Sequence, residues 1–162
     1  MPDWWPSLDT ASKFAPICTA LIALAAVIIA WLAIQAQKDI ARKRAAIDFF
    51  IKTETDGTLI EMYGVFKEEI QDVKWGMPID AFVKKENYLK VRAFLNLCEL
   101  IAVGIRRDAF SDDVSFHYWG DVLRDAFRDA RPLIDYVRTE ENKPATYCDL
   151  EWVCRERWHD RV

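Results

Sequence analysis

The sequence has little of the chemistry on which most enzymes depend. Its 162 residues include only two histidines, His117 and His159, and these do not form a His-x-x-x-His pair. No Cys-x-x-Cys pair occurs among the four cysteines, so a zinc centre is not expected. The five glycines are isolated, which excludes a glycine-rich phosphate-binding loop. We therefore expect no metal, no cofactor and no enzyme activity.

Charge is also absent from one long segment. No charged side chain occurs from Phe14 to Gln37, although 30% of the whole chain is charged. As a helix this run is about 36 Å long, enough to cross a hydrocarbon core of about 30 Å. A cleaved signal peptide has a basic start and a shorter apolar run, whereas the tail here carries Asp3 and Asp9. The sequence predicts a tail at 1–13, a transmembrane helix at 14–37 and a helical domain at 38–162.

The flanks of the apolar run indicate its orientation. Before it come Trp4 and Trp5, which favour the headgroup region, and a single basic residue, Lys13. After it comes a basic cluster formed by Lys38, Arg42, Lys43 and Arg44. The excess of basic residues on that side predicts a bacterial inner-membrane protein with its N-terminus outside and its domain in the cytoplasm. The same cluster is suited to contact with anionic membrane lipid.

Small residues recur along the predicted transmembrane helix. At successive spacings of four and three residues lie Thr19, Ala23, Ala26, Ala30 and Ala33. We call these five residues the small-residue seam. Between helices in lipid, close backbone approach along small residues is a main source of association. The seam therefore predicts a homo-oligomer, or pairing with the span of another protein.

The remaining sequence is helical in pattern, with no convincing alternation of the kind that a strand shows. We expect an all-α domain, a bundle of about five helices. The first continues the transmembrane helix through 45–52, and the second ends before Pro78, because the residue before proline disfavours helix. The others are expected at about 80–105, at 111–119, from 121 to about 137 with a kink at Pro132, and from a Thr146–Asp149 capping box to Trp158.

A polar column interrupts the otherwise apolar helix expected at 93–105. Arg92, Asn96 and Glu99 are spaced by four and three residues, which places them on one face. A carboxylate on a buried helix needs a partner, or its pKa rises. One interpretation makes Glu99 a general acid or base or a ligand-binding group. The other, which is more frequent, pairs it with Arg124 or Arg131 to fix the register of two helices.

The charge balance and the cysteines limit the remaining function classes. The predicted cytoplasmic part has a small excess of acidic residues, so no nucleic-acid partner is expected. In a reducing cytoplasm the four cysteines are expected to be free thiols. The C-terminal tail contains Trp152, Trp158 and several arginines, and we expect it to pack through its tryptophans.

Several of these features together resemble a bacterial family. They are the single span, the basic stop, the helix with Asn96, Glu99 and a Gly104-Ile105 end, an acidic turn at Asp112-Asp113, and an Arg-x-x-Trp ending at residues 155–158. The family consists of small single-span membrane proteins with a helical cytoplasmic domain of unknown function. The resemblance implies fold and location, and no activity.

The layout also has a more distant likeness to the membrane-anchored accessory proteins of type VI-B CRISPR systems. That likeness implies a HEPN-like bundle that assembles into membrane pores in antiviral defence. The HEPN ribonuclease motif places four to six residues between an arginine and a histidine, and Arg155 and His159 do not have this spacing. The leading hypothesis is thus a membrane-anchored assembly or interaction protein with a protein partner. The alternatives are a pore-forming or membrane-disturbing defence effector and a small tethered enzyme that uses Glu99.

Overall fold

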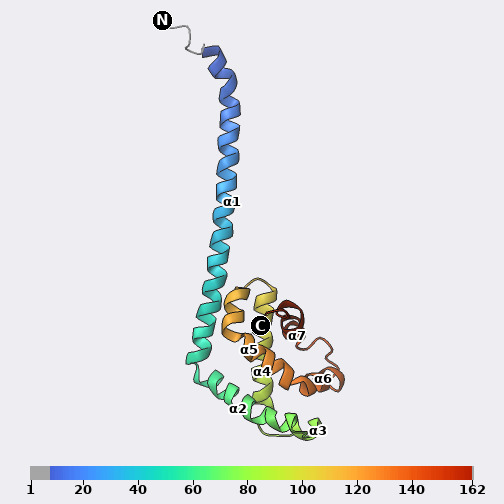
Figure 1. The fold of residues 1–162 in the computed structure, drawn as a ribbon. Coiled ribbons are helices and arrows are strands. Elements are labelled where there is room, and N and C mark those ends of the chain that lie inside the picture. Colours follow the sequence, from blue (N-terminus) through green and yellow to red (C-terminus); the bar gives the residue numbers. More distant parts are fainter. Residues whose placement is uncertain (1–7, 162) are drawn as a thin grey trace. The chain divides into compact units, whose positions relative to one another are not determined.

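A computed structural model describes residues 8–161, with the side chains of residues 14 and 16–161. The elements in chain order are α1 (Leu8–Thr55), α2 (Gly57–Lys74), α3 (Ile79–Phe82), α4 (Tyr88–Arg106), α5 (Asp112–Asp129), α6 (Arg131–Thr139), α7 (Cys148–Trp152) and the π-helical turn η1 (Val153–Arg157) (Figure 1). No strand occurs within residues 8–161, and the all-α class is confirmed. The chain divides into two compact units between Ala41 and Arg42.

The described part of the N-terminal unit is one helix, the portion of α1 that ends at Ala41. This helix is long and apolar enough to cross a membrane, and its most apolar segment buries nothing inside the protein. The helix begins at Leu8, earlier than the expected start of the span at Phe14. The expected interfacial residues Trp4 and Trp5 lie outside the described residues.

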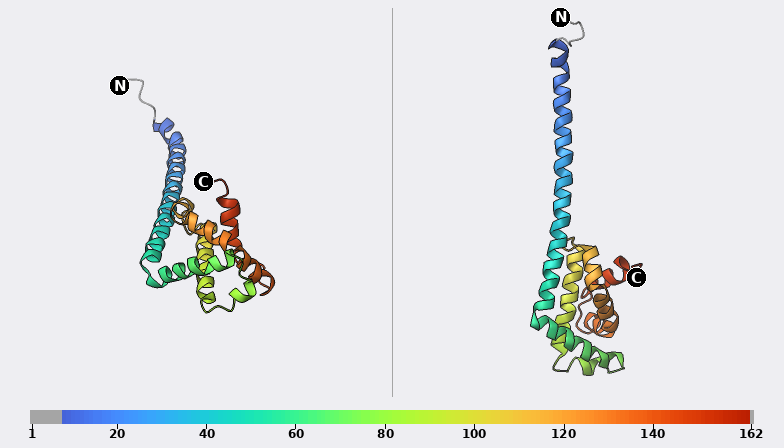
Figure 2. Two further views of the ribbon diagram at one scale, coloured as in Figure 1. Left: turned by 60° about the horizontal axis from the view of Figure 1, so that its bottom comes forward. Right: turned by 60° about the vertical axis from the view of Figure 1, so that its left-hand side comes forward.

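The core of the C-terminal unit is built around α4. This helix contacts α2, α5, α7 and η1, and α2 crosses it steeply in both views of Figure 2. Phe94, Leu95 and Ile101 on α4 are fully buried. Phe50, from the last turns of α1, packs against Trp119 with ring centroids 6.2 Å apart. The expected central helix is therefore present.

The second helix ends where the sequence predicts. The Asp56 side chain accepts a hydrogen bond from the Thr58 amide at 2.9 Å, which caps the start of α2. The helix ends at Lys74, and Gly76 then adopts a φ of 98°, which a residue with a side chain rarely adopts. The predicted stop before Pro78 is confirmed.

The third helix is not continuous from residue 80 to residue 105, as expected, but is interrupted between α3 and α4. Two side chains in the interruption bind α2. The Lys85 ammonium contacts Glu69 and Asp72, and the Asn87 amide donates to Glu69 at 2.7 Å. These tertiary contacts hold the turn, and no proline or glycine marks it in the sequence.

The expected break at Gly120 is also wrong, because α5 continues through this residue. Gly120 adopts an ordinary helical φ beneath the ring of Phe116, where an added Cβ would lie 3.3 Å from the ring. The helix ends instead at Asp129. Pro132 lies in the first turn of the separate helix α6, where its missing N–H costs nothing, and it therefore does not kink a longer helix.

The expected Thr146–Asp149 capping box does not form. Tyr147 is the residue before α7 and adopts a φ of 59°, and no side chain at that position caps the helix. Val153–Arg157 then forms the π-helical turn, so the last helix is shorter than expected. The first amide groups of α7 instead donate hydrogen bonds to a side chain of α4.

Candidate functional site

The polar column on α4 faces the connection between α6 and α7. Arg92 begins the column and reaches Glu141, with Nη1 lying 2.8 Å and 3.0 Å from the two carboxylate oxygens. Tyr88 Oη donates to the same carboxylate at 3.1 Å. Hydrogen bonds from Lys143, and then from Arg92 and Tyr88, lower the pKa of Glu141 to about 2. The start of the connection is thereby held on α4 by a charged group.

Asn96, in the middle of the column, accepts a hydrogen bond from Tyr147. The phenol oxygen of Tyr147 lies 3.1 Å from Asn96 Oδ1, and the side chain is 1% exposed. Burial raises the pKa of Tyr147, so its hydroxyl remains a donor over the ordinary pH range. This bond accompanies the left-handed backbone conformation of Tyr147, which turns the chain into α7.

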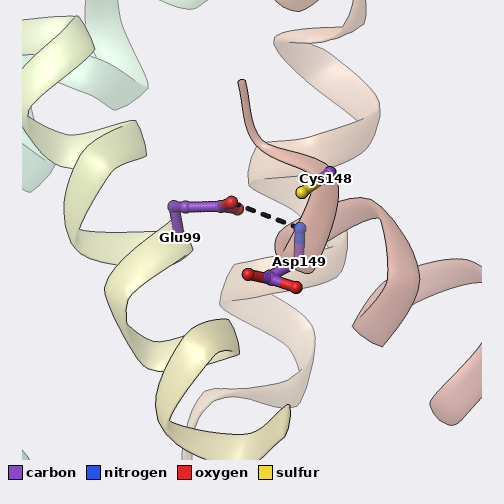
Figure 3. A group of neighbouring side chains, drawn as sticks. All are labelled: Glu99, Cys148 and Asp149. Atoms are coloured by element: carbon purple, nitrogen blue, oxygen red, sulfur yellow. Dashed lines mark hydrogen bonds between the residues drawn. The ribbon is translucent and has the colours of Figure 1, made fainter. Parts of the chain in front are cut away.

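Glu99 ends the column and caps α7. One carboxylate oxygen accepts from the Asp149 amide at 3.2 Å (Figure 3). The other accepts from the Leu150 amide at 2.8 Å. Burial raises the pKa of Glu99, and these two hydrogen bonds oppose that rise. Because the first amide groups of a helix lack partners within the helix, a carboxylate placed there satisfies them and favours the helix dipole.

The expected arginine partners of Glu99 bind elsewhere. Arg124 donates to the Arg161 carbonyl at 2.7 Å and to Asp121 at 2.8 Å. Arg131 binds Asp135 and, at 2.8 Å, Glu151. The predicted ion pair was wrong because two backbone amides of α7 lie directly opposite Glu99. Each of these amides donates a hydrogen bond to one of its carboxylate oxygens.

One potential metal-ligand group lies at the same place. Glu99, Cys148 and Asp149 each offer an atom, and the three atoms lie within 4.8 Å of one another. Both oxygens of Glu99 already accept backbone hydrogen bonds, and Asp149 forms an ion pair with Arg106. These contacts give the group the geometry of a helix cap.

Two anchoring carboxylates were missed by the sequence interpretation. Glu151 binds Arg138 at 2.7 Å in addition to Arg131, and Asp112 accepts from the indole of Trp158 at 2.8 Å. Trp158 is fully buried, so the expected packing of the tail through this tryptophan is confirmed. The sequence indicated Asp112 through the acidic turn at the start of its helix. Nothing in the sequence indicated that its partner would be Trp158, 46 residues away.

The residues predicted to meet the membrane divide between the two units. All members of the small-residue seam are exposed on α1, as are Lys38, Lys43 and Arg44. Of the basic cluster, only Lys38 lies in the N-terminal unit, whereas Arg42, Lys43 and Arg44 lie in the C-terminal unit. The Arg42 side chain binds Asp108 at 2.9 Å, and its backbone carbonyl accepts from the Ser111 amide at 3.3 Å. Arg42 therefore contributes to the fold of that unit in addition to the charge of the cluster.

Comparison with known proteins identifies a family and no activity. No curated protein and no solved structure matches the chain. The family described as "Domain of unknown function (DUF4760)" matches residues 20–158. This range includes the small-residue seam from Ala23 onward, the polar column and the buried Trp158. The chain belongs to the DUF4760 family.

Proposed function

We propose that this protein is a membrane-anchored helical module that acts by assembling with other copies or by binding a protein partner. The observation that supports it best is the exposure of the apolar helix, on which Ile22 is 70% and Val27 66% exposed. Burying one such side chain is worth about 1.5–3 kcal/mol, so the helix gains greatly from lipid or from another chain. A single crossing of the bacterial inner membrane is the simplest way to bury it.

The orientation follows from the charges at the end of the apolar segment. Lys38, Lys43 and Arg44 are exposed after it, and this is the arrangement that retains the basic side in the cytoplasm. The C-terminal unit is then cytoplasmic. Its polar column supports a binding role over catalysis, because both oxygens of Glu99 accept backbone hydrogen bonds that cap α7.

Self-assembly is tested by replacing small residues of the seam with larger ones. Replacing Ala26 and Ala30 with leucine keeps the helix apolar and prevents close backbone approach along the seam. The matched control replaces Ala20 and Ala25 with leucine, because these residues lie on other faces of α1. The mass of the full chain is measured in a mild detergent and in nanodiscs. We expect a defined wild-type oligomer that the seam variant loses and the control retains.

Other outcomes of the same experiment decide between the roles. A wild-type monomer would discard self-assembly and direct the search to a protein partner of the C-terminal unit. Equal loss of assembly in both variants would assign association to the apolar surface in general. An oligomer that also releases dye from vesicles would support the pore-forming effector, which the distant HEPN-like resemblance associates with antiviral defence.

A further inference from the structure

The last turns of α1, which belong to the C-terminal unit, have two sides with opposite environments. Ala46, Phe50 and Thr53 are buried, and none of them is more than 6% exposed. Ile47 and Ile51 directly follow the first two of these residues and are 46% and 57% exposed. Because each residue turns a helix by about 100°, the two isoleucines lie on a different side from the residues that enter the core. We call Ile47 and Ile51 the isoleucine pair.

The spacing of the isoleucine pair continues a pattern that begins in the small-residue seam. After Ala33, the last member of the seam, alternate steps of four and three residues reach Gln37, Ile40, Arg44, Ile47 and Ile51. These steps are the a and d spacing of a coiled coil, and α1 is helical over the whole stretch. Ile47 then occupies a d position and Ile51 an a position, and isoleucine is a usual residue at both.

Lipid tails are a poor partner for the isoleucine pair. Both residues follow the basic cluster, and charged side chains of that kind do not enter the hydrocarbon core. Asp48 lies between them and is exposed, and its negative charge disfavours contact with anionic lipid headgroups. An apolar protein surface is therefore the better partner.

The charges beside the isoleucine pair suit a second copy of the same chain. Lys43 occupies the g position before Arg44, Asp48 occupies the next e position, and both side chains are exposed. In a parallel coiled coil, g of one helix lies beside the following e of the other, and opposite charges there set the choice of partner and the orientation. Two parallel copies thus place Lys43 of each beside Asp48 of the other.

Arg44 limits how such copies can pair. It is exposed and occupies the a position one turn before Ile47. A polar residue at a single a position lowers the stability of a coiled coil and specifies its register. Asp48 follows Arg44 by four residues on the same helix, where its carboxylate reduces the repulsion between facing arginines. Arg44 therefore favours copies that are aligned residue by residue.

We propose that the end of α1 in the C-terminal unit forms a parallel coiled coil with a second copy of this chain. The isoleucine pair forms its apolar contact, and Lys43 and Asp48 form ion pairs between the copies. This inference rests on the proposed function, because copies are parallel only if they are anchored in the membrane in the same direction. It adds an interface outside the membrane to the one along the seam.

The first experiment measures the mass of the full chain in a mild detergent over a range of protein concentrations. Ile47→Lys together with Ile51→Lys should raise the concentration for half-assembly at least ten-fold. Leu89→Lys together with Leu100→Lys is the matched control, because these leucines are 73% and 54% exposed on α4 and the added charge is the same. The control should assemble as the wild type does. Thermal unfolding should be unchanged in both variants, because all four positions are exposed.

The second experiment tests whether the partner is another copy. Lys43→Glu and Asp48→Lys each place like charges beside one another between copies, and each alone should weaken assembly about five-fold. The chain with both changes has opposite charges there again and should assemble as the wild type does. Within one chain these residues are five positions apart and do not face each other on the helix, so this rescue requires two copies.

The outcomes separate this inference from the proposed function. A wild-type monomer overturns both the coiled coil and self-assembly. If the seam variant loses the oligomer and the lysine replacements at the isoleucine pair do not, self-assembly stands and the coiled coil is overturned. The coiled coil is also overturned if the Leu89 and Leu100 control weakens assembly equally, or if the exchange of charges fails to restore it.

Discussion

The two units of this protein use the same residue type in opposite ways. Leu24 in the N-terminal unit is 58% exposed, whereas Leu95 in the C-terminal unit is fully buried. In the C-terminal unit the leucine gains its stabilisation from neighbouring side chains of the same chain. In the N-terminal unit the chain supplies no such neighbours, so the stabilisation has to come from surroundings outside it. Exposure of apolar residues therefore indicates where a unit depends on its environment.

The largest effect expected from this comparison follows the removal of a leucine side chain from each unit. Leu95→Ala should lower the free energy of unfolding of the C-terminal unit by about 2–5 kcal/mol, because it loses buried apolar area and leaves a cavity. Leu24→Ala should leave that free energy unchanged. Thermal and denaturant unfolding of the full chain in nanodiscs, followed by tryptophan fluorescence, measures both. Equal destabilisation by the two variants would contradict the division into separate units.

A smaller effect is expected from the polar column, which stabilises the C-terminal unit in a different way. Glu99→Gln retains one acceptor for the α7 amides and places an N–H₂ group against the other amide. We expect a loss of about 1–3 kcal/mol in the free energy of unfolding, the cost of an unsatisfied buried group. Glu68→Gln, on the exposed side of α2, is the matched control and should have no effect.

The same variant separates a capping role from a catalytic one. If Glu99→Gln unfolds like the wild type and nevertheless loses its cellular function, the carboxylate acts on a substrate and the capping role is wrong. If the free energy of unfolding falls, Glu99 stabilises the fold. Hydrogen exchange at the Asp149 and Leu150 amides localises the loss, because these amides bind Glu99 directly.

The smallest effect is a pH dependence at the other end of the column. The pKa of Glu141 lies at about 2 in the folded protein, below its ordinary value of 4.5. Its ionised form therefore stabilises the fold above about pH 4.5, and this contribution disappears as the pH falls toward 2. Because its side chain is 25% exposed, we expect only about 1 kcal/mol after screening by solvent.

The measurement compares Glu141→Gln with the wild type in unfolding experiments between pH 6 and pH 2. The wild type should be more stable at pH 6 and should lose this advantage at low pH. Glu99 acts in the opposite direction, since its raised pKa favours the fold when the carboxyl is protonated, and the difference between the two proteins removes its influence. A constant difference across the range would show that the ion pair with Arg92 has no net effect.

Helix limits could be predicted where local chemistry sets them. Asp56 caps the start of α2, and α2 ends before Pro78, as the sequence predicts. The limits that were wrong depend on distant residues. The turn at Lys85 is held by carboxylates of α2, and Gly120 remains helical beneath Phe116. Intrinsic helix propensity has a weak effect, and such tertiary contacts override it.

In the candidate site, the sequence likewise predicted the local arrangement of the polar column but not its distant partners. Spacing alone placed Arg92, Asn96 and Glu99 on one face of a helix, and the structure has them there. Their partners lie about fifty positions away, at Glu141, Tyr147 and the α7 amides. Backbone amides have no signature in the sequence, so the ion pair expected for Glu99 could not be distinguished from a helix cap.

By itself, the sequence determined that the protein is all-helical, that one segment is apolar enough to cross a membrane, and that three polar residues share a face of α4. Helical periodicity and the absence of charge are local properties, and local properties can be read from a chain. Only the tertiary structure decided that Glu99 caps α7 and that Asp112 accepts a hydrogen bond from Trp158. Both depend on which groups meet after folding, because a hydrogen bond requires its partner within about 3 Å.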